Sequence, residues 1–442
     1  MIQESSPRLT AKSVFVTWLP LAASWALMAF ELPVTSAIIA RLANPEIHLA
    51  AFGSVVSPIA LIIEAPIIML LAASTALSKD WLSYRKLRRF MWSASLILTA
   101  FHIITAFTPL YYFVVRNILG IPEIIVEPAR IGLMIMTPWT ASIAYRRLNQ
   151  GVLIRFGHSR VVWIGTMVRL TAESIVLLIG YHTGTIPGII VAASAVATGV
   201  ISEAVYIGFR VHPVIENQLR KSPPVSPQLT KSAFLVFYVP LALTSLMFLF
   251  VQPIGSAAIS RMPRPLESLA VWPVVSGLIF LLRSICIAYN EVVVADLDIR
   301  GSYAILRRFT IYLVSASTFI LLVVASTPLA LLWFSKVSAL SPDLTDLALH
   351  GIWFAVPMPA LAALQSWYQG AILHSKQTRG IPEAVLLFLI TVTGILTLGV
   401  LNGKIIGLYI GLVAYVIGMI VQTFWLWVRS RPAMRSLRQR DA

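Results

Sequence analysis

Apolar runs of twenty residues or more recur along this chain, and no other feature of the sequence constrains its fold as strongly. Each run is long enough to cross a hydrocarbon core of roughly 30 Å as a helix. Hydrophobic residues make up 58% of the chain and charged residues 12%, with a mean hydropathy of +0.84, which excludes a set of soluble domains. The alternating polarity of an outer-membrane barrel is not apparent. The sequence therefore predicts an all-α integral membrane protein.

We predict about twelve transmembrane helices, with boundaries good to a few residues. Their approximate ranges are 13–40, 49–78, 90–115, 127–150, 161–181, 185–210, 231–260, 267–294, 308–333, 346–373, 382–402 and 404–428.

The net charge of +16 would suggest nucleic acid as a partner of a soluble protein. Here most of the basic residues fall in loops on one side of the predicted spans, as the positive-inside rule describes. The expected partner is thus the lipid bilayer and not nucleic acid. We expect a monomer in the plasma (inner) membrane with both termini in the cytoplasm. The polar start of the chain leads into the first span without a small-residue cleavage site, so no removable signal peptide is expected.

The stretch Thr137–Arg160 is echoed by the stretch Val356–Arg379 at one constant offset. The matching positions are Pro138 and Pro357, Gln150-Gly151 and Gln369-Gly370, and Arg160 and Arg379. Further matches at an offset one residue longer join Pro20 to Pro240, Pro33 to Pro253 and Ser36–Arg41 to Ser256–Arg261. The chain is therefore expected to consist of two similar halves.

A polar, Pro-rich connection separates the two halves. The predicted domains are a six-helix lobe at 1–215, a cytoplasmic linker at 216–230 and a second six-helix lobe at 231–442. Because six is an even number, the copies share one orientation and are related by an axis along the membrane normal. This plan is typical of transporters, although a duplication kept only for packing would look the same. The prolines expected to act as hinges or packing elements are Pro33, Pro66, Pro253, Pro138 and Pro357.

Two acids inside predicted spans stand beside prolines, as Glu31-Leu32-Pro33 and Glu64-Ala65-Pro66. An ionisable residue in a span costs roughly 2.5–3.5 kcal/mol on insertion scales and usually faces a cavity or a partner. A proline frees the carbonyl four residues before it. Each acid could therefore bind a proton, a cation or a cationic substrate, or it could be a protonated, hydrogen-bonded group at a kink.

Other polar residues in the spans give weaker signals. Arg169 and Glu173 are four residues apart and form a predicted ion pair on one helix face, which stabilises the first lobe or contributes to a site. Glu203 lies nearer the cytoplasmic end of its span, where water is expected to reach it. Gln252 stands next to Val251, the repeat counterpart of Glu31.

The second half carries a cation where the first carries an acid. Arg283 lies within one residue of the position that matches Glu64, and its own helix has no acid within four residues. It is expected either to bind an anionic cargo or to pair with Glu31 or Glu64.

No enzyme motif stands out. Asp296 and Asp298 resemble a metal-binding pair, but two acids in a charged loop are expected by chance. Cys286 is the only cysteine, and we find no HExxH motif, phosphate loop or nucleophile elbow. We expect no catalytic residue, no metal site and no cofactor, and any pumping would use a gradient of H⁺ or Na⁺.

With this two-fold plan and the stretch Gly151-x-Leu153-x-x-x-Gly157-x-x-Arg160, the chain resembles the multidrug/oligosaccharidyl-lipid/polysaccharide (MOP) exporter superfamily. The general likeness is to multidrug and toxic compound extrusion (MATE) transporters. That resemblance implies a V-shaped pair of six-helix bundles around a central cavity. It also implies that Glu31 would stand where those transporters usually have an aspartate.

The chain is also similar to the progressive ankylosis protein family, in the segments Phe237–Leu243, Gln252–Ile254, Ser260-Arg261 and Ala144–Arg155. That likeness implies export of organic anions such as citrate, nucleotides or pyrophosphate, with which Arg283 agrees. We therefore expect a secondary exporter of a small organic solute, with Glu31, Glu64, Arg283, Arg169, Glu173 and Gln252 as site residues. An anion exporter and a lipid-linked precursor flippase remain as alternatives.

Overall fold

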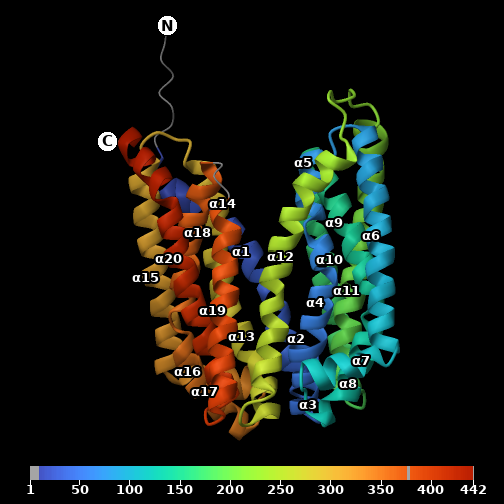
Figure 1. The fold of residues 1–442 in the computed structure, drawn as a ribbon, viewed down its shortest axis with the longest axis vertical. Coiled ribbons are helices and arrows are strands. Elements are labelled where there is room, and N and C mark those ends of the chain that lie inside the picture. Colours follow the sequence, from blue (N-terminus) through green and yellow to red (C-terminus); the bar gives the residue numbers. More distant parts are fainter. Residues whose placement is uncertain (1–8, 376–378, 442) are drawn as a thin grey trace. The chain divides into compact units, whose positions relative to one another are not determined.

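The computed structural model describes residues 9–375 and 379–441 as helices joined by short turns (Figure 1). Within these ranges, eleven helices are long and apolar enough to cross a membrane, as expected of a multi-pass membrane protein. The predicted span 127–150 is divided between a 13-residue helix, α8 (Glu123–Ile135), and a more polar helix, α9 (Thr137–Arg155). The prediction of an all-α membrane fold is confirmed.

The chain divides into two compact units, which we describe separately. Unit 2 spans Ile38–Ser260. Its helices in chain order are α3 (Pro45–Ala50), η1 (Ala51–Val56), α4 (Ser57–Ile68), α5 (Leu70–Leu77), α6 (Trp81–Phe107), α7 (Leu110–Tyr112), η2 (Phe113–Ile118), α8, α9, α10 (Ser159–Thr183), α11 (Gly188–Val214), η3 (Ile215–Leu219) and α12 (Lys231–Ile259).

Unit 1 combines Met1–Ala37 with Arg261–Ala442. Its helices are α1 (Ala11–Ala29), α2 (Glu31–Ile39), which runs across the unit boundary, α13 (Pro265–Ile287), α14 (Tyr289–Asp296), α15 (Ser302–Ser326), α16 (Pro328–Leu331), η4 (Leu332–Val337), α17 (Pro342–Ala355), α18 (Met358–His374), α19 (Gly380–Asn402) and α20 (Gly407–Asp441).

The units differ from the lobes drawn on the sequence repeat in the first helix of each half. Helix α1 belongs with the helices of the second half, since the Trp18 indole donates to the Ile285 carbonyl at 3.1 Å and its ring packs against Phe309. Helix α12 belongs with the first half, since the Tyr238 hydroxyl donates to the Pro66 carbonyl. The boundaries 1–215, 216–230 and 231–442 thus follow the repeat and not the compact units.

The repeat itself is visible in the backbone. Asn44 and Arg264 both adopt left-handed conformations, with φ of 52° and 56°, just before α3 and α13. The C-caps Gly184 and Gly403 also share positive φ values, of 64° and 61°. The first pair is 220 residues apart and the second 219, so one residue is lost from the offset between them.

The π-helical turn η1 accounts for that lost residue. A π turn closes its hydrogen bond one residue later than an α turn, so it holds one additional residue. The first half has such a turn at Ala51–Val56, whereas α13 is α-helical throughout. Beyond η1 the offset is 219, because the breaks at Met69 and Ala288 coincide. Glu64 and Arg283 therefore occupy the same position in the two copies.

The five prolines predicted as hinges lie in different local structures. Pro33 follows the break between α1 and α2 at Phe30, and Pro66 precedes the break at Met69. Pro253 lies inside α12, which continues without interruption. Pro138 and Pro357 lie at the starts of α9 and α18, each after a break in its span. Four of the five are thus near a break, and their role as hinges remains a prediction.

Candidate functional site

A buried ion pair joins α9 to α11 inside unit 2. The Arg146 guanidinium forms a salt bridge with the Glu203 carboxylate, and both side chains are almost completely buried. The Gln150 amide donates to the second Glu203 oxygen at 2.9 Å. Arg146 and Gln150 are four residues apart, so they lie on the same face of α9 and both donate hydrogen bonds to the same carboxylate.

Glu64 adds a second acid to this interior. The residue lies on α4 and is only 4% exposed. It interacts electrostatically with both neighbouring arginines, more strongly with Arg147 than with Arg146. Within the described ranges, one Glu64 carboxylate oxygen is buried without a hydrogen-bond partner. Two carboxylates and two guanidiniums therefore share the inside of unit 2, and their formal charges balance.

This arrangement suits the binding of a proton or a small cation. A buried carboxylate oxygen that lacks a donor is costly, and a proton or a cation would relieve that cost. Protonation of Glu64 would remove one negative charge and leave the cluster with a net positive charge. An anionic group or a structural change could then correct that imbalance.

Two sequence interpretations need correction here. We expected Glu203 to be reached by water, but it is fully buried against Arg146 because α9 covers that face of α11. The positive-inside rule was also expected to explain most of the basic residues. That explanation fits the exposed Arg155 and Arg160, whereas Arg146 lies in the interior.

The structure places Arg169 and Glu173 on the face of α10 that meets α11. A Cβ atom added at Gly199 would lie 3.2 Å from Arg169 Cγ and 3.3 Å from Glu173 Cβ. The two side chains thus share one helix face, as their spacing predicted, and Gly199 gives them room. Gln252 is half-buried on α12 in the same unit.

The remaining predicted residues belong to unit 1. Glu31 is half-buried in the first turn of α2. Arg283 on α13 is close enough to Tyr415 on α20 for an electrostatic interaction. Within the described ranges, the Arg283 Nε and the Tyr415 hydroxyl are buried without hydrogen bonds. The Tyr415 ring packs on Trp272, with ring centroids 5.3 Å apart. Arg283 thus lies beside Tyr415, one member of an aromatic pair.

The repeat shows how the interiors of the two units diverge. At the positions of Arg146 and Glu203, the second copy has Gln365 and Gln422, and the Gln365 amide donates to the Gln422 side-chain carbonyl at 3.2 Å. The contact between the same two helices is kept, but it is neutral. At the position of Glu64 the charge changes sign to that of Arg283. Alignment of the two halves matches Arg146 with Gln365 and Glu203 with Gln422. Because polar residues recur at both positions, this match was the signal in the sequence for the arginine–glutamate contact.

Unit 1 also contains a polar cavity of about 200 Å³. Trp25 and Glu291 lie on one side of it, and the Trp25 indole donates to the carboxylate at 3.3 Å. Asn290, Gln365 and Gln369 add amides, and the Asn290 amide donates to the Ser366 carbonyl at 3.2 Å. Glu291 thus contributes the one carboxylate among the described residues that line this cavity.

No protein-family model matches the chain, and no curated protein matches its sequence. Solved structures do match its fold. An inward-facing MATE family transporter of the MOP superfamily has a TM-score of 0.75 at 13% identity, over 96% of this chain and 99% of that one. The lipid II flippase MurJ in an inward closed conformation gives 0.73 at 13% identity, over 96% and 90%.

A third structure is a MOP superfamily transporter from Pyrococcus furiosus, described as having a binding pocket of reverse polarity. It has a TM-score of 0.57 at 14% identity, over 98% of this chain and 97% of that one. All three likenesses cover nearly the whole chain at low identity, so they concern the fold. The chain has the fold of the MATE transporters of the MOP superfamily and of the lipid II flippase MurJ.

Proposed function

We propose that the protein is a secondary active exporter that moves a small organic solute out of the cytoplasm by alternating access, driven by entry of H⁺ or Na⁺. The observation that carries this proposal is Glu64, a membrane-buried carboxylate with one unsatisfied oxygen beside two arginines. Such residues in spans typically lie on ion pathways and in proton relays. The fold, shared with transporters and a flippase, is consistent with this role.

The coupling step rests on the charges around Glu64. When a proton or Na⁺ binds, the carboxylate no longer offsets Arg147, and the interior of unit 2 gains one positive charge. A ligand shifts a conformational equilibrium only by binding one state more tightly than the other. We propose that the ion binds Glu64 preferentially in one of the two access states.

The polar cavity in unit 1 is a candidate contact for the solute. Glu291 and the surrounding amides offer several hydrogen-bond acceptors, and Trp25 offers an aromatic surface. These groups suit a polar solute that donates hydrogen bonds. The cavity would hold only part of a larger solute.

One observation favours a second candidate, export of an organic anion or flipping of a lipid-linked precursor. Arg283 is a cation in the middle of a span, and its Nε lacks a hydrogen bond within the described ranges. A guanidinium in an apolar setting is well suited to a carboxylate or phosphate. Arg283→Gln should then abolish binding of citrate, nucleotide or pyrophosphate, whereas it should spare a neutral or cationic solute.

The test of coupling uses purified protein in proteoliposomes. The cargo is first found by a thermal-shift screen against organic cations, citrate, nucleotides and pyrophosphate, with and without Na⁺, because a ligand of the folded state raises its stability. Glu64→Gln should then abolish gradient-driven transport while the protein remains folded. Glu123→Gln, at an exposed ion pair, is the matched control. Gradient-driven transport by Glu64→Gln at the normal rate would refute the coupling role.

A further inference from the structure

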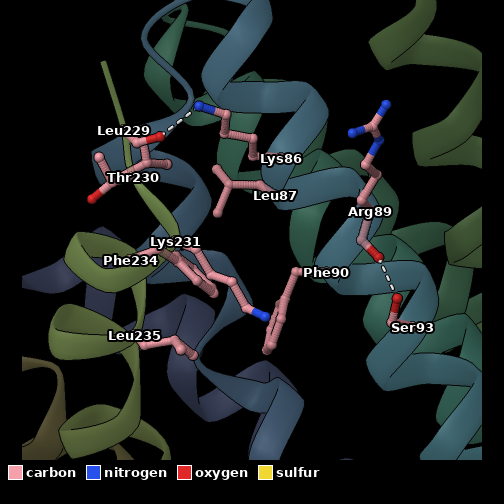
Figure 2. A pocket seen from close by; sticks show the side chains of 10 residues that line it. All are labelled: Lys86, Leu87, Arg89, Phe90, Ser93, Leu229, Thr230, Lys231, Phe234 and Leu235. Carbon is pink, nitrogen blue, oxygen red and sulfur yellow. Dashed lines mark hydrogen bonds between the residues drawn. The ribbon is translucent and has the colours of Figure 1, made fainter. Parts of the chain in front are cut away.

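A cavity of about 420 Å³ lies in unit 2 between residues 86–93 of α6 and the start of α12 (Figure 2). Its lining changes in character along α12, where Lys231 is the first residue and Phe234 and Leu235 follow about one turn later. On α6, Lys86 is the sixth residue, and Arg89 and Phe90 follow it as neighbours. This cavity is separate from the buried charges of the candidate site.

The two lysines have unused hydrogen-bonding capacity. The Lys86 ammonium donates to the Leu229 carbonyl at 2.7 Å, which uses one of its three N–H donors. Lys231 extends toward Phe90 in Figure 2. Among the described residues, neither lysine forms an ion pair with a carboxylate. Lys86 lies close enough to the Asp80 carboxylate for an electrostatic interaction. An anion in the cavity would therefore meet one partly compensated ammonium group, that of Lys86, and that of Lys231.

The connection that leads into α12 is fixed against α6, so this wall of the cavity is preformed. Asp80 caps α6 by accepting from the Ser83 amide at 2.8 Å, and its other oxygen accepts from the Val225 amide at 3.0 Å. Burial opposes the Asp80 charge, but these hydrogen bonds and the nearby Lys86 ammonium outweigh it and lower the pKa of the carboxyl. The Arg220 guanidinium lies 4.6 Å from the Trp81 ring centroid.

The apolar part of the cavity continues onto the outer surface of α12. The Phe90 and Phe234 rings pack edge to face, with centroids 4.8 Å apart. Leu235 is 38% exposed, and the next residue, Val236, is 73% exposed. With a rise of about 1.5 Å per residue, these side chains lie roughly 5–7 Å deeper along α12 than Lys231.

Helix length places this gradient at the membrane boundary. Helices α6 and α12 have 27 and 29 residues, more than the roughly 20 that a hydrocarbon core requires. Their first turns therefore reach the headgroup region, and the next turns enter the acyl region. On α12, a cation at the first level and apolar side chains at the second match the two parts of a phospholipid, and Lys86 adds a second cation from α6.

Comparison of the two halves shows that the lysines of this cavity are not explained only by the general excess of basic residues in the loops. At the positions of Lys86 and Lys231, the other copy has Ile305 and Ala11, and only Arg89 is matched by a cation, Arg308. The pair of lysines therefore belongs to one copy of the repeat and cannot be a consequence of the shared topology alone.

We propose that this cavity binds an anionic phospholipid, with its phosphate between Lys86 and Lys231 and an acyl chain over Phe234 and Leu235. A bound lipid would tie the start of α12 to α6. A soluble phosphate would use the lysines only, and the apolar continuation of the cavity would then have no role. The lipid site does not depend on the proposed export activity.

The test uses the full chain, delipidated in detergent and titrated with phosphatidylglycerol, phosphatidylcholine or inorganic phosphate. Binding is followed by native mass spectrometry and melting temperature. Phosphatidylglycerol should bind most tightly. Replacing both lysines, Lys86→Gln with Lys231→Gln, should weaken that binding by about fivefold for each lysine, from the usual attraction of a basic residue to an anionic surface. Arg308→Gln is the matched control and should leave it unchanged.

A third variant separates the lipid from a soluble anion. Leu235→Asn keeps every charge but should weaken phosphatidylglycerol binding, because it removes apolar contact with the acyl chain. Lysine variants that elute as single species and still bind phosphatidylglycerol as the natural protein does would overturn the proposal. Equal stabilisation by inorganic phosphate, or no effect of Leu235→Asn, would also overturn it.

Discussion

At the scale of single residues, the contact between Arg146 and Glu203 shows how much the surroundings decide. Arg146 stands in a basic sequence at the end of a predicted span, and its guanidinium is buried against a carboxylate. A buried pair does not by itself make a protein more stable, since desolvation offsets the attraction. Loss of one member is different, because the other charge remains buried without compensation.

Glu203→Gln should therefore destabilise the protein by about 3–5 kcal/mol, the usual cost of breaking a buried pair. The double variant Arg146→Gln with Glu203→Gln should recover most of that loss, because it copies the Gln365–Gln422 contact of the other repeat. The free energy of unfolding can be compared by titration with SDS. A double variant no more stable than Glu203→Gln would show that the amide pair cannot replace the charges here.

At the scale of elements, the π-helical turn η1 sets the direction in which Glu64 points. Each α-helical residue turns the helix by about 100°, since 3.6 residues complete a turn. An additional residue can be absorbed in a π turn without rotating the rest of the helix. The sequence revealed the slip of one residue in the repeat, whereas the structure assigns it to Ala51–Val56.

Deletion of Gly53, inside η1, should therefore convert the π turn to an α turn and leave the folded protein largely unchanged. Deletion of Leu61, in the regular helix α4, should rotate the part of α4 before residue 61 relative to Glu64. This rotation should disrupt the packing of α4 against α9. Size-exclusion profile and melting temperature measure both effects. If the two deletions lowered the melting temperature equally, η1 would not contain an inserted residue.

At the scale of the whole molecule, the two halves of the sequence exchange their first helices. Helix α1 is part of unit 1, and α12 is part of unit 2, although the repeat assigns each to the other half. If the chain is cut at the linker, each fragment contains most of one compact unit but lacks one helix of it. The N-terminal fragment lacks α12, and the C-terminal fragment lacks α1. The apolar surface left open would favour aggregation.

Fragments 1–222 and 227–442 should consequently fail to give monodisperse protein when expressed alone, and they should associate when expressed together. Co-purification through a tag on one fragment, followed by size-exclusion chromatography, measures this. A stable fragment 1–222 by itself would show that the first half needs no helix from the second. The orientation with both termini in the cytoplasm is a separate prediction that reporter fusions at each end can check.

Much of the fold could be predicted from sequence because the membrane restricts the choices. Without water to satisfy backbone groups, long apolar runs form helices. Length and hydropathy therefore indicated eleven of the spans, and the duplicated prolines and glycines indicated the repeat. The fourth span was less regular than expected, because its polar residues belong to the separate helix α9. Glu64 and Arg283 stood out because ionisable residues are rare in spans.

The sequence by itself determined the class of fold, the duplication and the unusual charges inside the spans, since these depend on properties of short segments. Only the tertiary structure decided which groups those charges meet. The pairing of Arg146 with Glu203 joins residues 57 positions apart. The membership of α1 and α12 likewise depends on packing between distant segments. Such contacts depend on how helix faces meet, and spacing within one helix does not specify them.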